Sequence, residues 1–319
     1  MVTAITLALA YLGGVAAYAA FAWNAIGQGA APGWLLAGAV LVYFAVPAIA
    51  AACWFAVAWI FRTPRPPQQR IGLAATLRLY WNEALAITRN GPRMAFWWWR
   101  LTDPVPSPAT APILLLHGVL CNGAVWRGWF ARLAARGLGP VYALSYGPPL
   151  SSIELFAEQA AAKIDAILAA TGARKVVLVG HSMGGLVARA YLRRYGGAKA
   201  HGLVTIGAPH HGSMHAWLFP GVCLAQMRPG SAWLSELNRD ESVGVPVVSI
   251  WSWHDSMVAP QTSSRLAGAA NIELIGIGHN ALLGDPSVFA LVAAELDRVA
   301  AAATVVSTPV AAAAVGTAA

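Results

Sequence analysis

The sequence predicts an α/β fold in which helices cover a mostly parallel sheet, preceded by a two-helix transmembrane hairpin. Three observations lead to this prediction. Residues 1–61 contain no Lys, Arg, Asp, Glu or His. From residue 112 onward, short apolar runs alternate with helical segments, a pattern that favours a parallel sheet covered by helices. Polar, glycine-rich segments follow several of these runs, as expected where functional groups lie at the carboxyl ends of parallel strands.

The composition excludes a disordered chain and argues against nucleic acid as a partner. Of the 319 residues, 58% are hydrophobic and 11% are charged, compared with about 25% charged residues in an ordinary soluble domain. The net charge is +8. However, residues 62–100 hold seven Arg and one Glu, whereas residues 101–319 are nearly neutral. A nucleic-acid-binding domain would carry its positive charge on its folded body.

Residues 1–61 are predicted to form a transmembrane helical hairpin. Val2–Trp23 and Trp34–Phe61 are each long enough to cross a bilayer as a helix, and Asn24–Gly33 forms the turn between them. A cleaved signal peptide needs a basic start and a shorter apolar stretch, and neither is present. A buried soluble hairpin would usually show a polar face. The arginines that follow the second helix place this end in the cytoplasm by the positive-inside rule.

Residues 62–111 are interpreted as a basic, Trp-rich interfacial segment followed by a linker. Leu, Ile and Trp mix with arginines up to Trp97-Trp98-Trp99-Arg100, which suits a membrane headgroup region. A helix packed on the following domain, with the tryptophans in its core, is the alternative. Both interpretations stay open. Asp103–Pro112 is proline-rich and indicates a linker.

Residues 112–300 are predicted to form one α/β domain, and residues 301–319 a disordered tail. The predicted strands are Ile113–Leu116, Pro140–Ser145, Lys175–Val179, Gly202–Ile206, Val245–Trp251 and Ile272–Ile277. The predicted helices are Ser152–Ala170, Met183–Tyr195 and Pro286–Ala300.

Ser182 is the candidate nucleophile. It lies in Gly180-His181-Ser182-Met183-Gly184, which matches the pattern G-x-S-x-G. The pattern by itself is weak, but here it follows a predicted strand and opens a predicted helix, as a nucleophile elbow requires. The glycines leave room for the sharp turn that would project the serine hydroxyl above the sheet.

A serine hydroxyl needs a base to take its proton, and the base needs a carboxylate to orient it. His279 is the candidate base because it follows the last predicted strand in a glycine-containing loop. Asp255 is the candidate acid because it follows the strand before that. The chain order Ser182, Asp255, His279 is the order expected for a strand–turn–helix elbow of this kind.

The negative charge that develops on a substrate carbonyl oxygen needs two backbone N–H donors. Met183, the residue after the nucleophile, is expected to supply one. The other is expected from the loop after the first strand, with Val119 as our choice and Leu120 as the alternative.

These motifs together resemble bacterial lipases of the α/β-hydrolase fold. The resemblance rests on His117-Gly118, Gly180–Gly185 (GHSMGG), Thr205–Ser213 (TIGAPHHGS), Met227–Asn238 (MRPGSAWLSELN), Asp255 and Gly278-His279. It covers about residues 110–300 and implies a serine hydrolase of carboxylic esters. It also implies a cap or lid over the acyl-binding pocket at about residues 210–244, where Trp217, Leu218 and Phe219 are candidate lipid-binding residues.

The chain differs from secreted relatives, which begin with a signal peptide. We therefore expect a lipase or esterase in the bacterial inner membrane, with its catalytic domain on the cytoplasmic side and a lipid or other hydrophobic ester as substrate. Acyl transfer, thioester or amide cleavage by the same three residues, and an inactive membrane-tethered binding protein, remain alternatives. We expect no cofactor and no metal. Cys53, Cys121 and Cys223 are read as free thiols, although a Cys121–Cys223 pair stays open.

Overall fold

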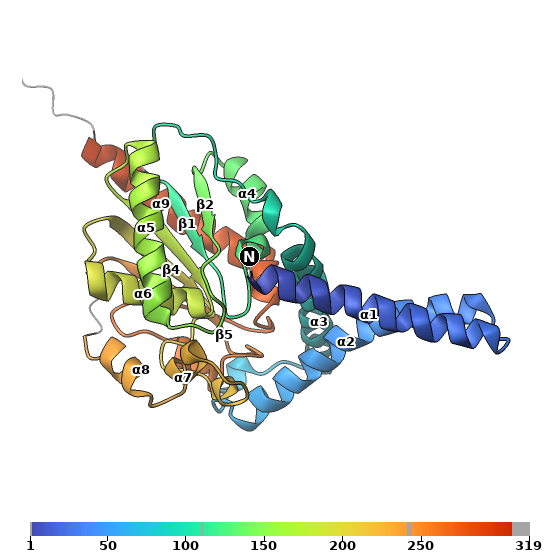
Figure 1. Cartoon of the computed structure of the whole chain (residues 1–319). Coiled ribbons are helices and arrows are strands. Elements are labelled where there is room, and N and C mark those ends of the chain that lie inside the picture. The colour runs from blue at the N-terminus through green and yellow to red at the C-terminus, as the bar shows by residue number, and fades with distance from the viewer. Residues whose placement is uncertain (1, 110, 241–243, 308–319) are drawn as a thin grey trace, which may run out of the picture.

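The computed structural model describes residues 2–109, 111–240 and 244–307 (Figure 1). The helices are α1 Val2–Gly27, α2 Pro32–Ile60, α3 Leu73–Phe96, α4 Arg127–Ala134, α5 Ile153–Thr171, α6 Met183–Tyr195, α7 Val222–Gln226, α8 Ala232–Leu237 and α9 Pro286–Ser307. The strands are β1 Ile113–Leu116, β2 Val141–Leu144, β3 Val176–His181, β4 Ala200–Ile206, β5 Val247–Ser252 and β6 Ala270–Leu274.

Within the described residues, the strands form one parallel sheet in the order β2-β1-β3-β4-β5-β6. This confirms the predicted α/β fold class. The chain passes from β1 to β2 on one side and then returns to β3 on the other side of β1. The strand order therefore reverses between β1 and β3, and the loops that follow these two strands border the crevice where open parallel sheets bind their ligands.

Alternate residues along β1, β2 and β3 enter two hydrophobic cores, one on each face of the sheet. In β1, Leu114 and Leu116 pack in the core covered by α5 and α6, whereas Ile113 and Leu115 pack in the core covered by α4 and α9. This alternation follows from the two-residue repeat of a strand. Because both faces are covered, the central strands are apolar throughout, which explains why they were recognisable in the sequence.

The helices α1 and α2 form a long hairpin that projects from the α/β unit (Figure 1). By length and composition alone, both could cross a membrane. In the most apolar 18-residue stretch of each helix, the mean hydropathy is 1.7 for α1 and 2.3 for α2, and only 6% of the stretch is buried. Large side chains such as Trp23, Trp34 and Leu36 are exposed along them. This exposure is what distinguishes the hairpin from a core helix pair of a soluble protein.

Helix α3 packs between the hairpin and the α/β unit (Figure 1). On one side, the Tyr80 hydroxyl donates to the Ala48 carbonyl of α2 at 2.8 Å. On the other side, Asn122 Nδ2 donates to the Met94 carbonyl at 2.9 Å. The segment thus packs on the folded chain, but Trp81 and Trp99 stay more than half exposed, so these two tryptophans do not form the core that one interpretation of this segment assumed.

Two further details bear on the sequence-based expectations, one as a difference and one, the free cysteines, as a confirmation. Helix α9 does not end at residue 300 but continues to Ser307, because alanine is the best helix former and nothing in Ala300–Ala303 stops the helix. The rest of the expected tail, residues 308–319, lies outside the described residues. All three cysteines are free thiols, so Cys121 and Cys223 are not paired.

Candidate active site

Ser182 stands at a sharp turn between β3 and α6. Its backbone adopts φ 55° and ψ −128°, a conformation that a non-glycine residue seldom takes and that commonly marks a functional site. The Ser182 N–H donates to the Ile206 carbonyl of β4 at 2.9 Å, and the Ser182 carbonyl accepts from the Gly185 N–H at 3.0 Å. These two bonds hold the strained turn at the carboxyl end of the sheet.

Close packing under the turn explains the neighbouring glycines. A Cβ added at Gly180 would lie 2.5 Å from the Gly185 backbone nitrogen, and one added at Gly184 would lie 2.3 Å from the Leu116 carbonyl oxygen of β1. Both distances are shorter than real Cβ contacts allow. The first turn of α6 can therefore approach β1 this closely only without side chains at these positions.

Asp255 and His279 come from different strand ends and form a direct pair. Asp255 lies after β5 and His279 after β6. His279 Nδ1 donates to Asp255 Oδ2 at 2.9 Å. The side chain of His279 is only 3% exposed and that of Asp255 only 1%. The other carboxylate oxygen of Asp255 accepts from the N–H groups of Met257 and Val258 at 2.8 and 2.7 Å. The backbone thus holds Oδ1 in place, and Oδ2 orients the imidazole.

The His279–Asp255 pair lies beside the Ser182 turn. A Cβ added at Gly207 would lie 3.2 Å from Asp255 Oδ2 and 3.4 Å from His279 Nδ1, and Gly207 directly follows the residue that binds the Ser182 N–H. His181 Nε2 also donates to the His279 carbonyl at 3.2 Å. Among the described residues, no hydrogen bond joins the Ser182 hydroxyl to His279. Such bonds are often long without substrate and shorten in the substrate complex.

The histidines around the turn have opposite pKa shifts. Burial by itself lowers the pKa of His279, but the charge and hydrogen bond of Asp255 and the charge of Glu83 outweigh burial and raise the pKa above 6.5. Burial lowers the pKa of His117 to about 4 and that of His181 well below its usual value. His279 is thus the histidine of this cluster whose protonated form the protein stabilises, as a general base requires.

The loop after β1 lies directly against Ser182. A Cβ added at Gly118 would lie 3.0 Å from Ser182 Cβ and 3.4 Å from its hydroxyl. Val119, the expected oxyanion donor, is the next residue in the chain. The Tyr146 hydroxyl donates to the His117 carbonyl, and the His117 Nδ1–H donates to the Gly118 carbonyl at 2.8 Å. Both bonds fix the loop that was expected to supply one oxyanion donor.

Met183, the other expected donor, is the first residue of α6. The first N–H groups of a helix have no acceptor within the helix. The positive end of the helix dipole also lies at this position. The Met183 N–H is therefore suited to binding negative charge that develops next to Ser182.

The three predicted lipid-binding residues lie on the surface beside α2. Trp217, Leu218 and Phe219 are 57%, 50% and 44% exposed. The ring of Phe219 lies 5.8 Å from that of Trp54 in α2, centroid to centroid. Just before them in the chain, His215 Nε2 donates to the Trp54 carbonyl at 3.1 Å. This part of the predicted cap is thus joined to the hairpin and presents apolar side chains outward.

One residue near the site was missed in the sequence. Glu83 of α3 is completely buried and accepts hydrogen bonds from Ser256, Asn280 and Ala281, the residues that directly follow Asp255 and His279. One sequence feature could have indicated it: Glu83 is the one acidic residue in the arginine-rich stretch 62–100. Its partners lie more than 170 positions away, so no local pattern indicated them.

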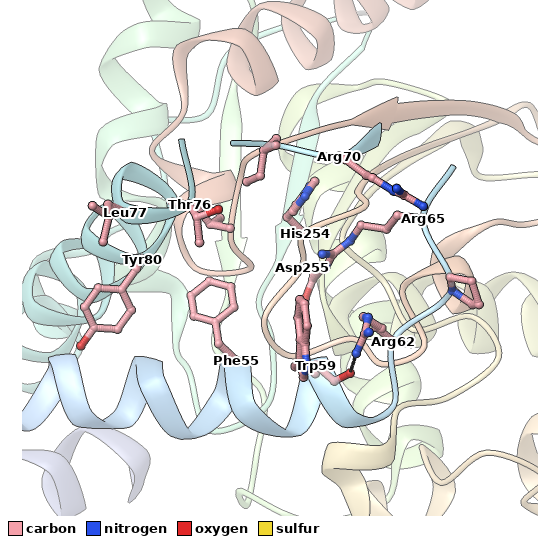
Figure 2. A pocket seen from close by; sticks show the side chains of 14 residues that line it. Phe55, Trp59, Arg62, Arg65, Arg70, Thr76, Leu77, Tyr80, His254 and Asp255 are labelled. Atoms are coloured by element: carbon pink, nitrogen blue, oxygen red, sulfur yellow. Dashed lines mark hydrogen bonds between the residues drawn. The ribbon is translucent and has the colours of Figure 1, made fainter. Parts of the chain in front are cut away.

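A pocket of about 820 Å³ lies between the end of α2, the segment after it, the first turns of α3 and the loop after β5 (Figure 2). Its wall includes Arg62, Arg65 and Arg70 together with His254 and Asp255. Ser182 does not line it. The pocket therefore borders the candidate site at Asp255 but does not include the nucleophile.

Comparison with known proteins agrees with this architecture. The α/β hydrolase fold family matches residues 111–224. The chain has the α/β-hydrolase fold. The mature lipase BlEst2 of Bacillus licheniformis superposes with a TM-score of 0.53 at 20% identity, over 61% of this chain and 96% of that one. Lipase B of Aspergillus fumigatus gives 0.53 at 21% identity, over 60% and 56% of the two chains.

Two curated proteins share a shorter stretch. Triacylglycerol lipases of Pseudarthrobacter phenanthrenivorans and Burkholderia plantarii are each 48% identical over 59 residues, which is 18% of this chain. The match spans 18% and 16% of the two relatives. It therefore supports a relationship to lipases and esterases but does not extend to the whole of these proteins.

Proposed function

We propose that the protein is a membrane-anchored serine hydrolase that cleaves carboxylic esters of lipids. The observation that carries the proposal is the 2.9 Å hydrogen bond from His279 Nδ1 to Asp255 Oδ2, formed next to the strained Ser182 turn. A buried, oriented imidazole beside a serine at a positive φ is the arrangement that activates a hydroxyl for attack on a carbonyl. The partial similarity to triacylglycerol lipases supports the same reaction class.

In the proposed reaction, His279 Nε2 accepts the Ser182 proton while the serine oxygen bonds to the ester carbonyl carbon. Asp255 stabilises the resulting imidazolium. The Met183 N–H and the Val119 N–H, or that of Leu120, bind the oxyanion. His279 then donates its proton to the leaving alcohol, which departs and leaves an acyl group on Ser182. Water, deprotonated by His279, releases the fatty acid and restores the hydroxyl.

A lipid substrate is supported by where the apolar side chains lie. Trp217, Leu218 and Phe219 present exposed apolar surface beside α2, and α1 and α2 are long and apolar enough to span a bilayer. An ester held in or near the membrane could therefore reach the cap without leaving an apolar environment. The arginines after α2 favour the cytoplasmic side of a bacterial inner membrane for the hydrolase domain.

A fluorophosphonate probe tests the proposal directly, because it reacts with an activated serine hydroxyl. We expect the full-length protein in membranes to be labelled, Ser182→Ala not to be labelled, and the matched control Ser235→Ala, on the exposed face of α8, to be labelled like the unmodified protein. A panel of ester, thioester and phospholipid substrates, with competing alcohols, then defines the reaction. Absence of labelling, or labelling that survives in Ser182→Ala, contradicts the proposal, and dominant acyl transfer would replace the hydrolase assignment.

A further inference from the structure

The strongest unassigned feature is a buried carboxylate that reaches the active site from outside the matched α/β-hydrolase region. Glu83 lies in α3, ahead of residues 111–224, and its side chain has no exposed surface. Burial of a charged group is costly unless hydrogen bonds or an opposite charge compensate it. Among the described residues, no ion pair includes Glu83, so hydrogen bonds must supply the compensation.

Four hydrogen bonds converge on this carboxylate. Glu83 Oε1 accepts from Ser256 Oγ at 2.6 Å, from the Asn280 N–H at 3.0 Å and from Asn280 Nδ2 at 2.9 Å. Glu83 Oε2 accepts from the Ala281 N–H at 2.9 Å. All four partners donate to Glu83. An ionised carboxylate only accepts hydrogen bonds, whereas a protonated one also carries an O–H that needs an acceptor. The surroundings are therefore built for an anion.

These donors belong to the two loops that carry the proposed acid and base. Ser256 directly follows Asp255, and Asn280 directly follows His279. Ser256 Oγ also accepts from the His279 N–H at 3.4 Å, so one hydroxyl links Glu83 to the backbone of the base. A Cβ added at Gly278 would lie 2.5 Å from Glu83 Oε2, which shows how closely the loop follows the carboxylate.

We propose that Glu83 is a positioning residue that holds the Asp255 and His279 loops in register, so that α3 forms part of the active site. This inference rests on the proposed hydrolase function. Helix α3 also contacts the hairpin through the Tyr80–Ala48 hydrogen bond. The membrane-proximal segment thus completes the catalytic site, and an α/β-hydrolase domain cut away from α3 would lose the carboxylate that fixes the base.

Glu83→Gln tests the role because it keeps the shape but replaces one acceptor oxygen by an NH₂ group that faces a donor. A shift of about 1 Å in a reacting group can cost about 100-fold in rate. We expect kcat to fall about 10- to 100-fold in Glu83→Gln with KM little changed. Ser256→Ala, which removes the bridging hydroxyl, should lower kcat less. The control is Asn82→Ala, at the exposed neighbouring position of α3.

The pH profile separates positioning from general stability. The titratable groups that face His279 are Asp255, Glu83, His181 and His215, and burial lowers the pKa of both histidines so that they stay neutral. The charge of Glu83 raises the His279 pKa. Its removal should therefore move the acid limb of kcat/KM to lower pH. A variant that only unfolds more easily would keep the midpoint of the unmodified protein.

The outcomes distinguish this inference from the proposed function. If the unmodified protein is not labelled at Ser182, the hydrolase function fails whatever Glu83 does. If it is labelled and turns over ester, but Glu83→Gln matches Asn82→Ala in kcat and in the pH midpoint, the positioning role is overturned. If Glu83→Gln fails to fold, Ser256→Ala decides, and an unchanged kcat in that variant overturns the inference.

A second observation, independent of Glu83, concerns the arginine-lined pocket of about 820 Å³ (Figure 2). Arg62 Nη1 donates to the Trp59 carbonyl at 2.5 Å, and Arg65 Nε donates to the Trp253 carbonyl at 2.8 Å. No ion pair among the described residues includes an arginine of this pocket. The one acidic residue of its wall, Asp255, already binds His279 and two backbone N–H groups.

The pocket combines unneutralised positive charge with apolar walls. Burial, followed by the charge of Arg62, lowers the pKa of Arg65, so this guanidinium is partly buried beside a second cation. Phe55, Leu77 and Tyr80 form an apolar wall, and the pocket begins where the long apolar helix α2 ends. A ligand that matches both parts carries an anionic phosphate and an acyl chain.

We propose that this pocket, whose lining includes Asp255 but not Ser182, binds the phosphate headgroup of an anionic phospholipid. The test uses the full-length protein in nanodiscs of phosphatidylcholine with or without phosphatidylglycerol, and native mass spectrometry of the lipids it retains. We expect the unmodified protein to retain phosphatidylglycerol. The double variant Arg65→Gln/Arg70→Gln should retain at least 10-fold less of it. The control is Arg136→Gln, an exposed arginine paired with Asp297.

Each result decides the lipid assignment. Selective loss of phosphatidylglycerol from the double variant supports the site, and equal retention by the double variant and the control overturns it. Inorganic phosphate is the second arm. If it binds the pocket and phosphatidylglycerol shows no preference over phosphatidylcholine, the site takes free phosphate and the lipid assignment is wrong.

Discussion

His279 Nδ1 and Asp255 Oδ2 lie 2.9 Å apart in a region that is almost closed to solvent. Burial by itself would lower the pKa of the histidine, but the nearby charges and this hydrogen bond outweigh burial and raise the pKa above 6.5. The proposed base works only when neutral, and it is neutral above that pKa. The pH dependence of ester cleavage follows from this relationship.

Activity should therefore fall as the pH drops through a midpoint above 6.5. The measurement is kcat/KM for an uncharged ester between pH 4 and 9, because this ratio reports the pKa of the free enzyme. Ser182 labelling by a fluorophosphonate should follow the same curve. A rate that stays flat down to pH 4 would exclude His279 as the base.

Asp255→Asn should lower kcat by about 10⁴-fold, the usual cost when an orienting carboxylate is replaced and the imidazole takes the wrong tautomer. Circular dichroism and thermal unfolding should show that the variant still folds, since the amide keeps the shape of the carboxylate. The matched control is Asp297→Asn, whose exposed carboxylate pairs with Arg136 and contributes about 0–1 kcal/mol. Comparable activity in the two variants would remove Asp255 from the mechanism.

Gly118→Ala should lower activity at least 10-fold with little loss of stability. The new methyl group would lie 3.0 Å from Ser182 Cβ and 3.4 Å from its hydroxyl, in the space that the proposed reaction assigns to the ester carbonyl. Stopped-flow or steady-state ester kinetics measure the effect, and the thermal midpoint checks the fold. If Gly118→Ala keeps full activity, the substrate does not approach Ser182 from the loop after β1.

Gly184→Ala should destabilise the protein by about 1–3 kcal/mol, the usual cost of overpacking. The added methyl group would lie 2.3 Å from the Leu116 carbonyl oxygen, and neither backbone segment can move away easily. Gly128→Ala in α4 is the control, because nothing lies within 4 Å of its Cβ position; it should stabilise the helix by about 0.5–1 kcal/mol. Urea unfolding compares the two, and equal stability would contradict the tight packing under the elbow.

Trp217→Ala should change the free energy of unfolding by no more than about 0.5 kcal/mol, because the side chain is 57% exposed. If the surface beside α2 binds lipid chains, KM for a long-chain ester should rise several-fold while KM for an acetyl ester stays unchanged. The control is Arg239→Gln, in the same predicted cap but on an exposed ion pair. A uniform effect on both esters would argue against an acyl-binding role.

The sequence by itself determined the fold class and most of the residues of the candidate site. The strands of a parallel sheet are covered on both faces, so they appear as unbroken apolar runs. The groups after them then meet at one edge because carboxyl ends of parallel strands lie together. This local and topological logic was enough to select Ser182, Asp255 and His279, and the structure has Asp255 and His279 in direct contact.

Tertiary structure alone decided where residues 62–100 pack. Their pattern of Arg, Leu and Trp fits both an interfacial segment and a packed helix, because each needs one apolar face and one charged face. Only the folded chain brings Glu83 to Ser256 and Asn280, which are 173 and 197 positions away. A buried carboxylate satisfied by four distant donors leaves no periodic trace in the sequence, because hydrogen bonding depends on position in space and not on spacing along the chain.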